Sequence, residues 1–170
     1  MANKTIRTIL ALDGEKEFRQ KLTQCNSVLA TMKANVKQLT AEYELDGKQI
    51  KTLKDKKQLL QNQSTQLSDK LKILKDAVKA TEDAYDKANV EYKEACELYG
   101  EDSEEAQRLE KCLLKLEQRT NGYKQQIANT NVELLQNQQA LRDVNAEIDK
   151  GSQEHQKFSQ DVVKLGTGIR

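Results

Sequence analysis

The chain has 170 residues, of which 32% are charged and 36% are hydrophobic, and it contains no proline. A chain of this length with average composition would contain roughly eight prolines, and a proline inside a helix costs about 3 kcal/mol. The absence of proline therefore favours a chain that is helical nearly throughout. Low hydrophobicity is also typical of disordered chains, but the balance of 28 basic against 27 acidic residues and the regular spacing of the apolar residues oppose disorder.

The net charge of +1 creates no long-range field that would attract nucleic acid or an anionic membrane, so we expect neither partner. No stretch reaches the roughly 18 consecutive apolar residues of a membrane span, and the first ten residues lack the apolar core of a signal peptide. We therefore expect a cytoplasmic protein. Cys25, Cys96 and Cys112 are an odd number at irregular spacing, a pattern that indicates neither a disulfide framework nor a zinc site.

Residues 1–14 differ in character from the rest of the chain. Residues 5–12 are β-branched and apolar, and Asp13-Gly14 is a turn signal. We expect one short β-strand followed by a turn. Because a lone strand is unstable in water, it would need the edge of another copy or of a different protein. The alternative is an additional turn of helix or a frayed end.

A heptad repeat begins at Phe18 and keeps one phase as far as Tyr99. Its apolar residues recur at alternating steps of four and three, which is typical of a helix in a left-handed coiled coil. We predict one long helix over 15–99. Gly47 weakens a helix by about 1 kcal/mol relative to alanine, and we favour a kink at 45–47. A full reversal there, giving three helices, stays open.

The sequence Gly100-Glu101-Asp102-Ser103 predicts a sharp turn. Gly100 suits the C-terminus of a helix, and Asp102 with Glu105 forms an N-terminal capping box for the next one. The heptad phase then resumes, and we predict a return helix over 103–149. The predicted fold class is all-α: a long antiparallel coiled-coil hairpin, with three helices as the alternative, preceded by one short strand.

In such a hairpin, seam residues whose numbers add up to 201 face each other. This register places polar residues together, Ser64 with Asn137 and Thr81 with Thr120, and a polar layer of this kind fixes register at some cost in stability. The apolar residues that we expect in the hairpin core are Leu53, Leu60, Leu67, Leu74, Val78, Tyr85, Tyr92, Leu109, Leu116, Tyr123, Ile127, Leu134, Leu141 and Ile148.

The return helix is too short to cover the first part of the seam if the chain does not reverse at 45–47. An apolar stripe would then need another chain, and burying each such side chain is worth about 1.5 to 3 kcal/mol. We therefore predict self-association through residues 18–45, with a homo-oligomer as the result. The seam residues concerned are Phe18, Leu22, Leu29, Met32, Val36, Leu39 and Tyr43.

For residues 150–170 we predict a short helix and a tail. Lys150-Gly151-Ser152 is expected to break the return helix, and the segment 165–170 has the character of a chain that stops before its next element.

The sequence offers little catalytic chemistry. His155 is the only histidine and has no partner at the spacing of a catalytic set. There is no glycine-rich phosphate loop and no acidic cluster with metal-ligand spacing, so we expect no enzyme activity and no cofactor. A basic run is interpreted as a solvated face rather than a phosphate site, because no aromatic residues interleave it: Lys48, Lys51, Lys54, Lys56 and Lys57.

Four segments resemble the N-terminal region of tape measure proteins from long-tailed bacteriophages and prophages: TIRTILALDGEKEFRQKL, VLATMKANVKQLTAEYELDGKQIKTLKDKKQLL, ELYGEDSEEAQRLEKCLLKLE and VVKLGTGIR. The resemblance implies a structural role in tail assembly and tail-length determination, without catalytic residues. It implies tail-tube subunits, assembly chaperones and further copies as partners, first in the host cytoplasm and then in the tail lumen. The alternative is a generic cytoplasmic coiled-coil adaptor or spacer that binds a partner helix.

Overall fold

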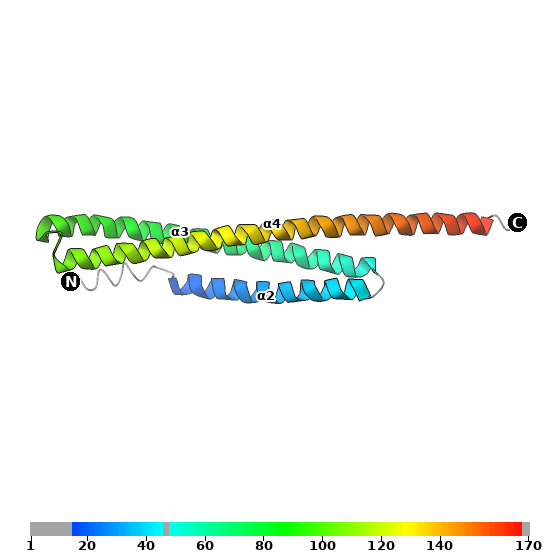
Figure 1. Cartoon of the computed structure of the whole chain (residues 1–170), viewed down its shortest axis with the longest axis horizontal. Helices are drawn as coiled ribbons and strands as arrows, with labels where there is room; N and C mark the ends of the chain where they lie inside the picture. The colour runs from blue at the N-terminus through cyan, green and yellow to red at the C-terminus, as the bar shows by residue number, and fades with distance from the viewer. Residues whose placement is uncertain (1–14, 46–47, 168–170) are drawn as a thin grey trace. The chain divides into compact units, whose positions relative to one another are not determined.

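The computed structural model describes residues 15–45 and 48–167, and all of these except 48–49 and 100–103 are helical. There are three described helices, α2 (Glu15–Leu45), α3 (Ile50–Tyr99) and α4 (Glu104–Thr167) (Figure 1). The all-α prediction is confirmed for this part of the chain, whereas the strand predicted at 5–12 lies outside it. No helix within the described ranges is long and apolar enough to cross a membrane.

The chain divides into two compact units, which are described separately. Unit 1 comprises Met1–Asn26 and Ser68–Val132, and unit 2 comprises Ser27–Leu67 and Glu133–Arg170. Each of the three helices contributes residues to both units.

In unit 1, a sharp turn at 100–103 joins α3 to α4, as predicted. Gly100 has a φ of 87° and its N–H donates to the Cys96 carbonyl at 2.9 Å, so it ends α3 with a left-handed cap that suits glycine. The prediction that Asp102 caps α4 is wrong. Because α4 begins at Glu104, the N-cap is Ser103, whose Oγ accepts the Ala106 N–H at 3.2 Å.

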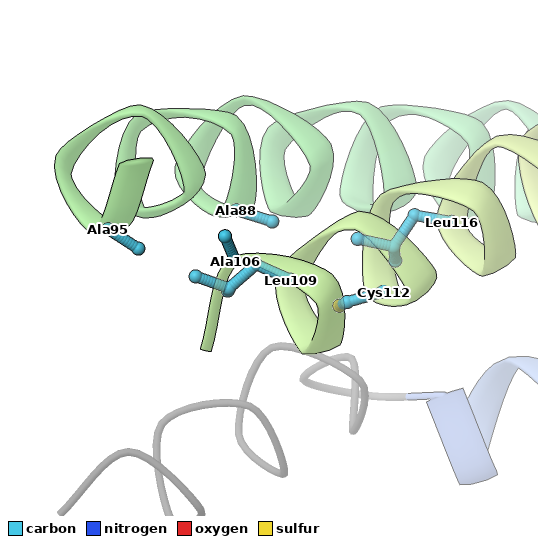
Figure 2. Close-up of a cluster of buried hydrophobic side chains, with 6 residues drawn as sticks. All are labelled: Ala88, Ala95, Ala106, Leu109, Cys112 and Leu116. Atoms are coloured by element: carbon cyan, nitrogen blue, oxygen red, sulfur yellow. The ribbon is translucent and has the colours of Figure 1, made fainter. Parts of the chain in front are cut away.

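The core of unit 1 beside this turn combines three alanines and a cysteine with two leucines (Figure 2). Ala88 and Ala95 of α3 are buried against α4, where Leu109 and Leu116 are also buried. The remaining buried members of this cluster are Ala106 and Cys112. Alanines at the contact let two helix backbones approach closely, since interaxial distance depends on the side chains between them.

In unit 2, α2 and α3 are separate helices, and the chain reverses between them (Figure 1). The Lys48 N–H donates to the Tyr43 carbonyl at 3.1 Å, which satisfies a carbonyl at the end of α2. Val36 and Tyr43 of α2 pack against a cluster made by Leu53, Leu60 and Val144 of α3 and α4.

The single kinked helix predicted over 15–99 is therefore wrong, and the three-helix alternative is the observed one. The physical reason is the apolar face of α2. Folding back buries that face against α3 and α4, which stabilises the three-helix arrangement.

The helix break predicted at 150–152 is also wrong, because α4 continues in unit 2 to Thr167. A side chain at Gly151 would lie 3.2 and 3.3 Å from two carbons of Ile50, so glycine here makes room for a neighbouring helix. One glycine costs a helix only about 1 kcal/mol. Beyond it, every residue from 152 to 163 is exposed.

Candidate functional site

The predicted self-association seam lies against the chain's own helices. Leu22 and Leu29 are buried, with 8% and 3% of their surface exposed. The other members are partly buried: Phe18, Met32, Val36, Leu39 and Tyr43. The structure therefore removes the premise that another chain must cover this seam, and self-association through 18–45 stays a prediction without that support.

The predicted hairpin core is brought together within each unit. Its fully buried members are Leu53, Leu60, Leu67, Leu74, Leu109 and Leu116. The partly buried ones are Val78, Tyr85, Tyr92, Tyr123, Ile127, Leu134, Leu141 and Ile148. None of these positions is exposed. The hairpin core predicted from the sequence therefore lies at the contacts between the described helices.

Both predicted polar pairs are hydrogen bonded. In unit 1, the Thr120 hydroxyl donates to Thr81 Oγ1 at 2.8 Å. In unit 2, Asn137 Nδ2 donates to Ser64 Oγ and to the Leu60 carbonyl, each at 2.7 Å. The predicted register of α3 against α4 is thus observed at two separate layers.

Two further buried polar residues, Gln63 and Thr130, were not predicted. Thr130 lies on the heptad seam and donates to the Gln126 carbonyl of its own helix at 2.7 Å. Gln63 is 6% exposed and lies beside the seam, one residue before Ser64. A two-helix interpretation of the sequence gives no reason to expect its burial.

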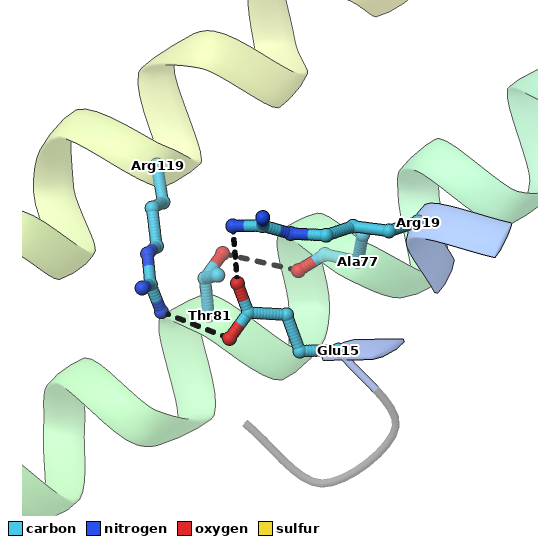
Figure 3. A network of polar contacts seen from close by, with 5 residues as sticks. All are labelled: Glu15, Arg19, Ala77, Thr81 and Arg119. Carbon is cyan, nitrogen blue, oxygen red and sulfur yellow. Dashed lines mark hydrogen bonds and ion pairs between the residues drawn. The ribbon is translucent and has the colours of Figure 1, made fainter. Parts of the chain in front are cut away.

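Ion pairs link α2 to α4 in both units. The sequence analysis does not predict these pairs. In unit 1, the Glu15 carboxylate lies between Arg19 at 2.7 Å and Arg119 at 3.2 Å (Figure 3). In unit 2, Lys33 Nζ lies 2.8 Å from Glu133. The contact between α2 and α4 follows from the reversal of the chain between α2 and α3, which makes α2 and α4 run in the same direction. The sequence signal that could have predicted this contact is charge complementarity between two parallel helices.

A groove of about 470 Å³ lies between α2 and α4 of unit 1. Its sides carry Arg19 and Arg119, and Gly122 leaves open space above α4. The other lining residues are Leu22, Thr23, Asn26, Tyr123 and Gln126. Because Glu15 already lies between the two guanidinium groups, the charges beside this groove are partly balanced and do not make a strong anion site.

Among the residues that the structure describes, the remaining reactive groups form no catalytic arrangement. His155 is exposed on α4. The three thiols are free, and burial raises the pKa of the Cys112 and Cys25 thiols, which lowers their thiolate fraction. Within the described ranges no group of three or more potential ligands could hold a metal ion.

The predicted basic run lies in unit 2, at and after the start of α3. Lys48, Lys51 and Lys54 are exposed, and Lys56 and Lys57 are partly exposed.

A search for related proteins found no match: no family model matches the chain, and neither a curated protein nor a solved structure is significantly similar to it.

Proposed function

We propose that the chain is a structural protein that acts by helix packing and docking, and that it forms the N-terminal part of a phage tail tape measure protein. The observation that carries this proposal is the arrangement of α2, α3 and α4, whose side chains are used to bind one another in both units. The family assignment itself rests on the resemblance of the opening segment and of the turn sequence around Gly100.

We further propose that the helices pack as a coiled coil, with side chains of one helix inserted between those of its neighbours. In α3 the buried seam positions recur every seven residues: Leu53, Leu60, Leu67, Leu74, Thr81, Ala88 and Ala95. A strict seven-residue period supports knobs-into-holes packing, because it keeps one stripe facing the partner as helices supercoil.

In this proposal the chain works in tail assembly, first in the host cytoplasm and later inside the tail. Its partners are further copies, tail-tube subunits and assembly chaperones, and its role requires no catalytic residue. The near-neutral net charge of +1 supports protein partners over nucleic acid or membrane.

The decisive experiment is genetic. If the genes beside this one encode tail-tube and tail-chaperone proteins, deleting residues 15–167 in frame should abolish tails of normal length in electron micrographs. A matched control is the substitution Leu114→Ala, which changes an exposed side chain and should leave the tails normal. Normal tails from the deletion, or the absence of neighbouring tail genes, would exclude the tail role.

A second candidate is a coiled-coil adaptor or spacer that binds a partner helix. The exposed apolar side chains on the last part of α4 favour it: Phe158 is 70% exposed and Val163 is 63% exposed. This candidate predicts a binding partner that is encoded away from any tail gene cluster.

A further inference from the structure

In unit 1, α2 lies beside α4 and near Asp69 and Lys70 of α3, and the helix faces that it meets can be followed toward the turn. On α4, Arg119 meets Glu15 of α2 at 3.2 Å, and Glu105 lies two seven-residue steps closer to the turn on the same face. On α3, the charge of Asp69 raises the pKa of the Cys25 thiol of α2 beyond the effect of burial, and that of Lys70 lowers it. Leu98 lies four seven-residue steps beyond Lys70. The faces of α3 and α4 that lie near α2 therefore both continue toward the turn, beyond Glu15.

At the turn these faces enclose a groove of about 160 Å³, which we call the tip groove. Its apolar part includes buried Ala95 and Leu109, together with Leu98 and Tyr99, which are 72% and 68% exposed. Its remaining lining residues are the carboxylates Glu91, Glu94 and Glu105. Large exposed apolar side chains beside a groove are typical of a binding surface.

The charge of this region is far from that of the whole chain. Residues 91–110 contain eight acidic and two basic residues, a net charge of −6, whereas the whole chain carries +1. None of Glu91, Glu94 and Glu105 forms an ion pair with another described residue. Burial raises the pKa of Glu91, and the charges of Glu94 and Glu105 raise it further, so these carboxylates repel one another.

We propose that the tip groove binds a basic amphipathic helix of another protein. A helix is a suitable occupant because in unit 1 α2 packs beside the corresponding face of α4, where Leu22 is buried and Glu15 pairs with Arg119. At the tip the groove charges are negative, so the complementary helix carries Lys or Arg beside its apolar stripe. The stripe contacts Leu98 and Leu109, and the cations neutralise the three carboxylates. This docking does not depend on the tail role.

The probe is a synthetic helical peptide with leucines on one face and lysines on the others, carrying a fluorescent label. Its binding to the full chain is measured by fluorescence anisotropy at low and high salt. The control peptide has glutamates in place of the lysines. We expect the basic peptide alone to bind, with an affinity that falls as salt rises, because charge pairs at the rim of an interface are screened.

Two variants with the same change in charge locate the contact. The triple variant E91Q/E94Q/E105Q removes the groove carboxylates, and its affinity for the peptide should fall about tenfold, as three rim ion pairs of roughly 0.5 kcal/mol each predict. The variant E97Q/E101Q/D102N removes three exposed charges beside the groove and should bind nearly as tightly as the wild type.

Three results would overturn the proposal. Equal losses in the two variants would show that the tip attracts cations without a defined site. An unchanged affinity in E91Q/E94Q/E105Q would place the peptide elsewhere. Failure of the wild-type chain to bind the peptide, as expected if its own residues 1–14 fill the groove, would exclude a partner helix at this position.

Discussion

Replacing the hydroxyls of the Thr81–Thr120 pair by methyl groups isolates one buried polar contact of unit 1. Thr120 donates to Thr81 Oγ1 at 2.8 Å, and it also lies 3.0 Å from the Leu116 carbonyl of its own helix. The Thr81 hydroxyl likewise lies 3.1 Å from the Ala77 carbonyl. In either single variant, Thr81→Val or Thr120→Val, the remaining hydroxyl therefore keeps a hydrogen-bond partner.

The expected energies follow from these contacts. Each single variant loses one hydrogen bond, worth about 1 kcal/mol, and gains one buried methyl group, worth about 0.8 kcal/mol. The free energy of unfolding of each single variant should therefore fall by only about 0.2 kcal/mol. The double variant loses both hydrogen bonds, about 2 kcal/mol, and gains two methyl groups, about 1.6 kcal/mol, so its free energy of unfolding should fall by only about 0.4 kcal/mol. The coupling energy of the cycle is then close to zero, because the hydroxyl that remains in each single variant bonds a carbonyl of its own helix.

The assay is urea unfolding of the four proteins, followed by far-ultraviolet circular dichroism under one set of conditions. The slopes of free energy against urea should agree, because the surface exposed on unfolding hardly changes. A coupling energy of about 1 kcal/mol or more would refute the reasoning that the remaining hydroxyl finds a carbonyl partner in each single variant. A loss of well over 1 kcal/mol in the double variant would refute the assumption that this layer can be replaced by apolar packing.

Three further predictions test burial, backbone conformation and charge. Leu74→Ala should lower the free energy of unfolding by about 2 to 5 kcal/mol in urea unfolding, because Leu74 is fully buried, whereas Leu114→Ala at an exposed site should change it by less than about 0.5 kcal/mol. Gly122→Ala should raise the melting temperature, because apart from the local backbone of α4 no atom lies within 4 Å of the added carbon, and alanine favours helix by about 1 kcal/mol. Gly100→Ala should lower the melting temperature, because φ there is 87°. The raised pKa of Glu91 makes its ionised form unfavourable in the folded protein, so Glu91→Gln should stabilise the chain at neutral pH, and urea unfolding should show this gain disappear on acidification through the pKa of Glu91.

The pairing of α3 with α4 was predictable because two local signals fix it. Gly100 marks the turn, and the heptad repeat then determines which residues face each other across it. Asn137 and Ser64 meet in unit 2 as this arithmetic requires. The exact start of α4 was missed by one residue, since both Asp102 and Ser103 are good capping residues and only the backbone decides between them.

The reversal between α2 and α3 was not predictable from periodicity. The heptad phase passes through this connection unchanged, from Tyr43 to Ile50 and Leu53, so a short loop that preserves the phase leaves no trace in the pattern. Gly47 alone could not decide between kink and reversal. The decision comes from tertiary burial: Val36 and Tyr43 of unit 2 find a core in the Leu53 cluster that a lone helix does not have.

At Gly151 the sequence analysis predicts a helix break that the structure does not have, whereas between α2 and α3 it favours a kink where the structure has a reversal. Glycine was interpreted as a helix breaker, but its effect here depends on Ile50 of the neighbouring helix, which occupies the space of the missing side chain. The candidate tip groove escaped sequence analysis for a similar reason. Glu91, Glu94 and Glu105 belong to two helices, and their proximity follows only from the turn that brings those helices together.

The polar pairs also limit how this chain could set a distance. Removing seven residues from α3 between Thr81 and the turn would keep the heptad phase, but it would place Thr120 opposite Leu74 and Thr81 opposite Leu113. The hairpin therefore tolerates a change in length only when α3 and α4 change together. A matched change of fourteen residues lengthens a hairpin by about 10 Å, whereas the same fourteen residues in one continuous helix span about 21 Å. A folded-back segment is thus poorly suited to setting a length. In the proposed tail role, its packed helices are better suited to binding other proteins than to measuring length.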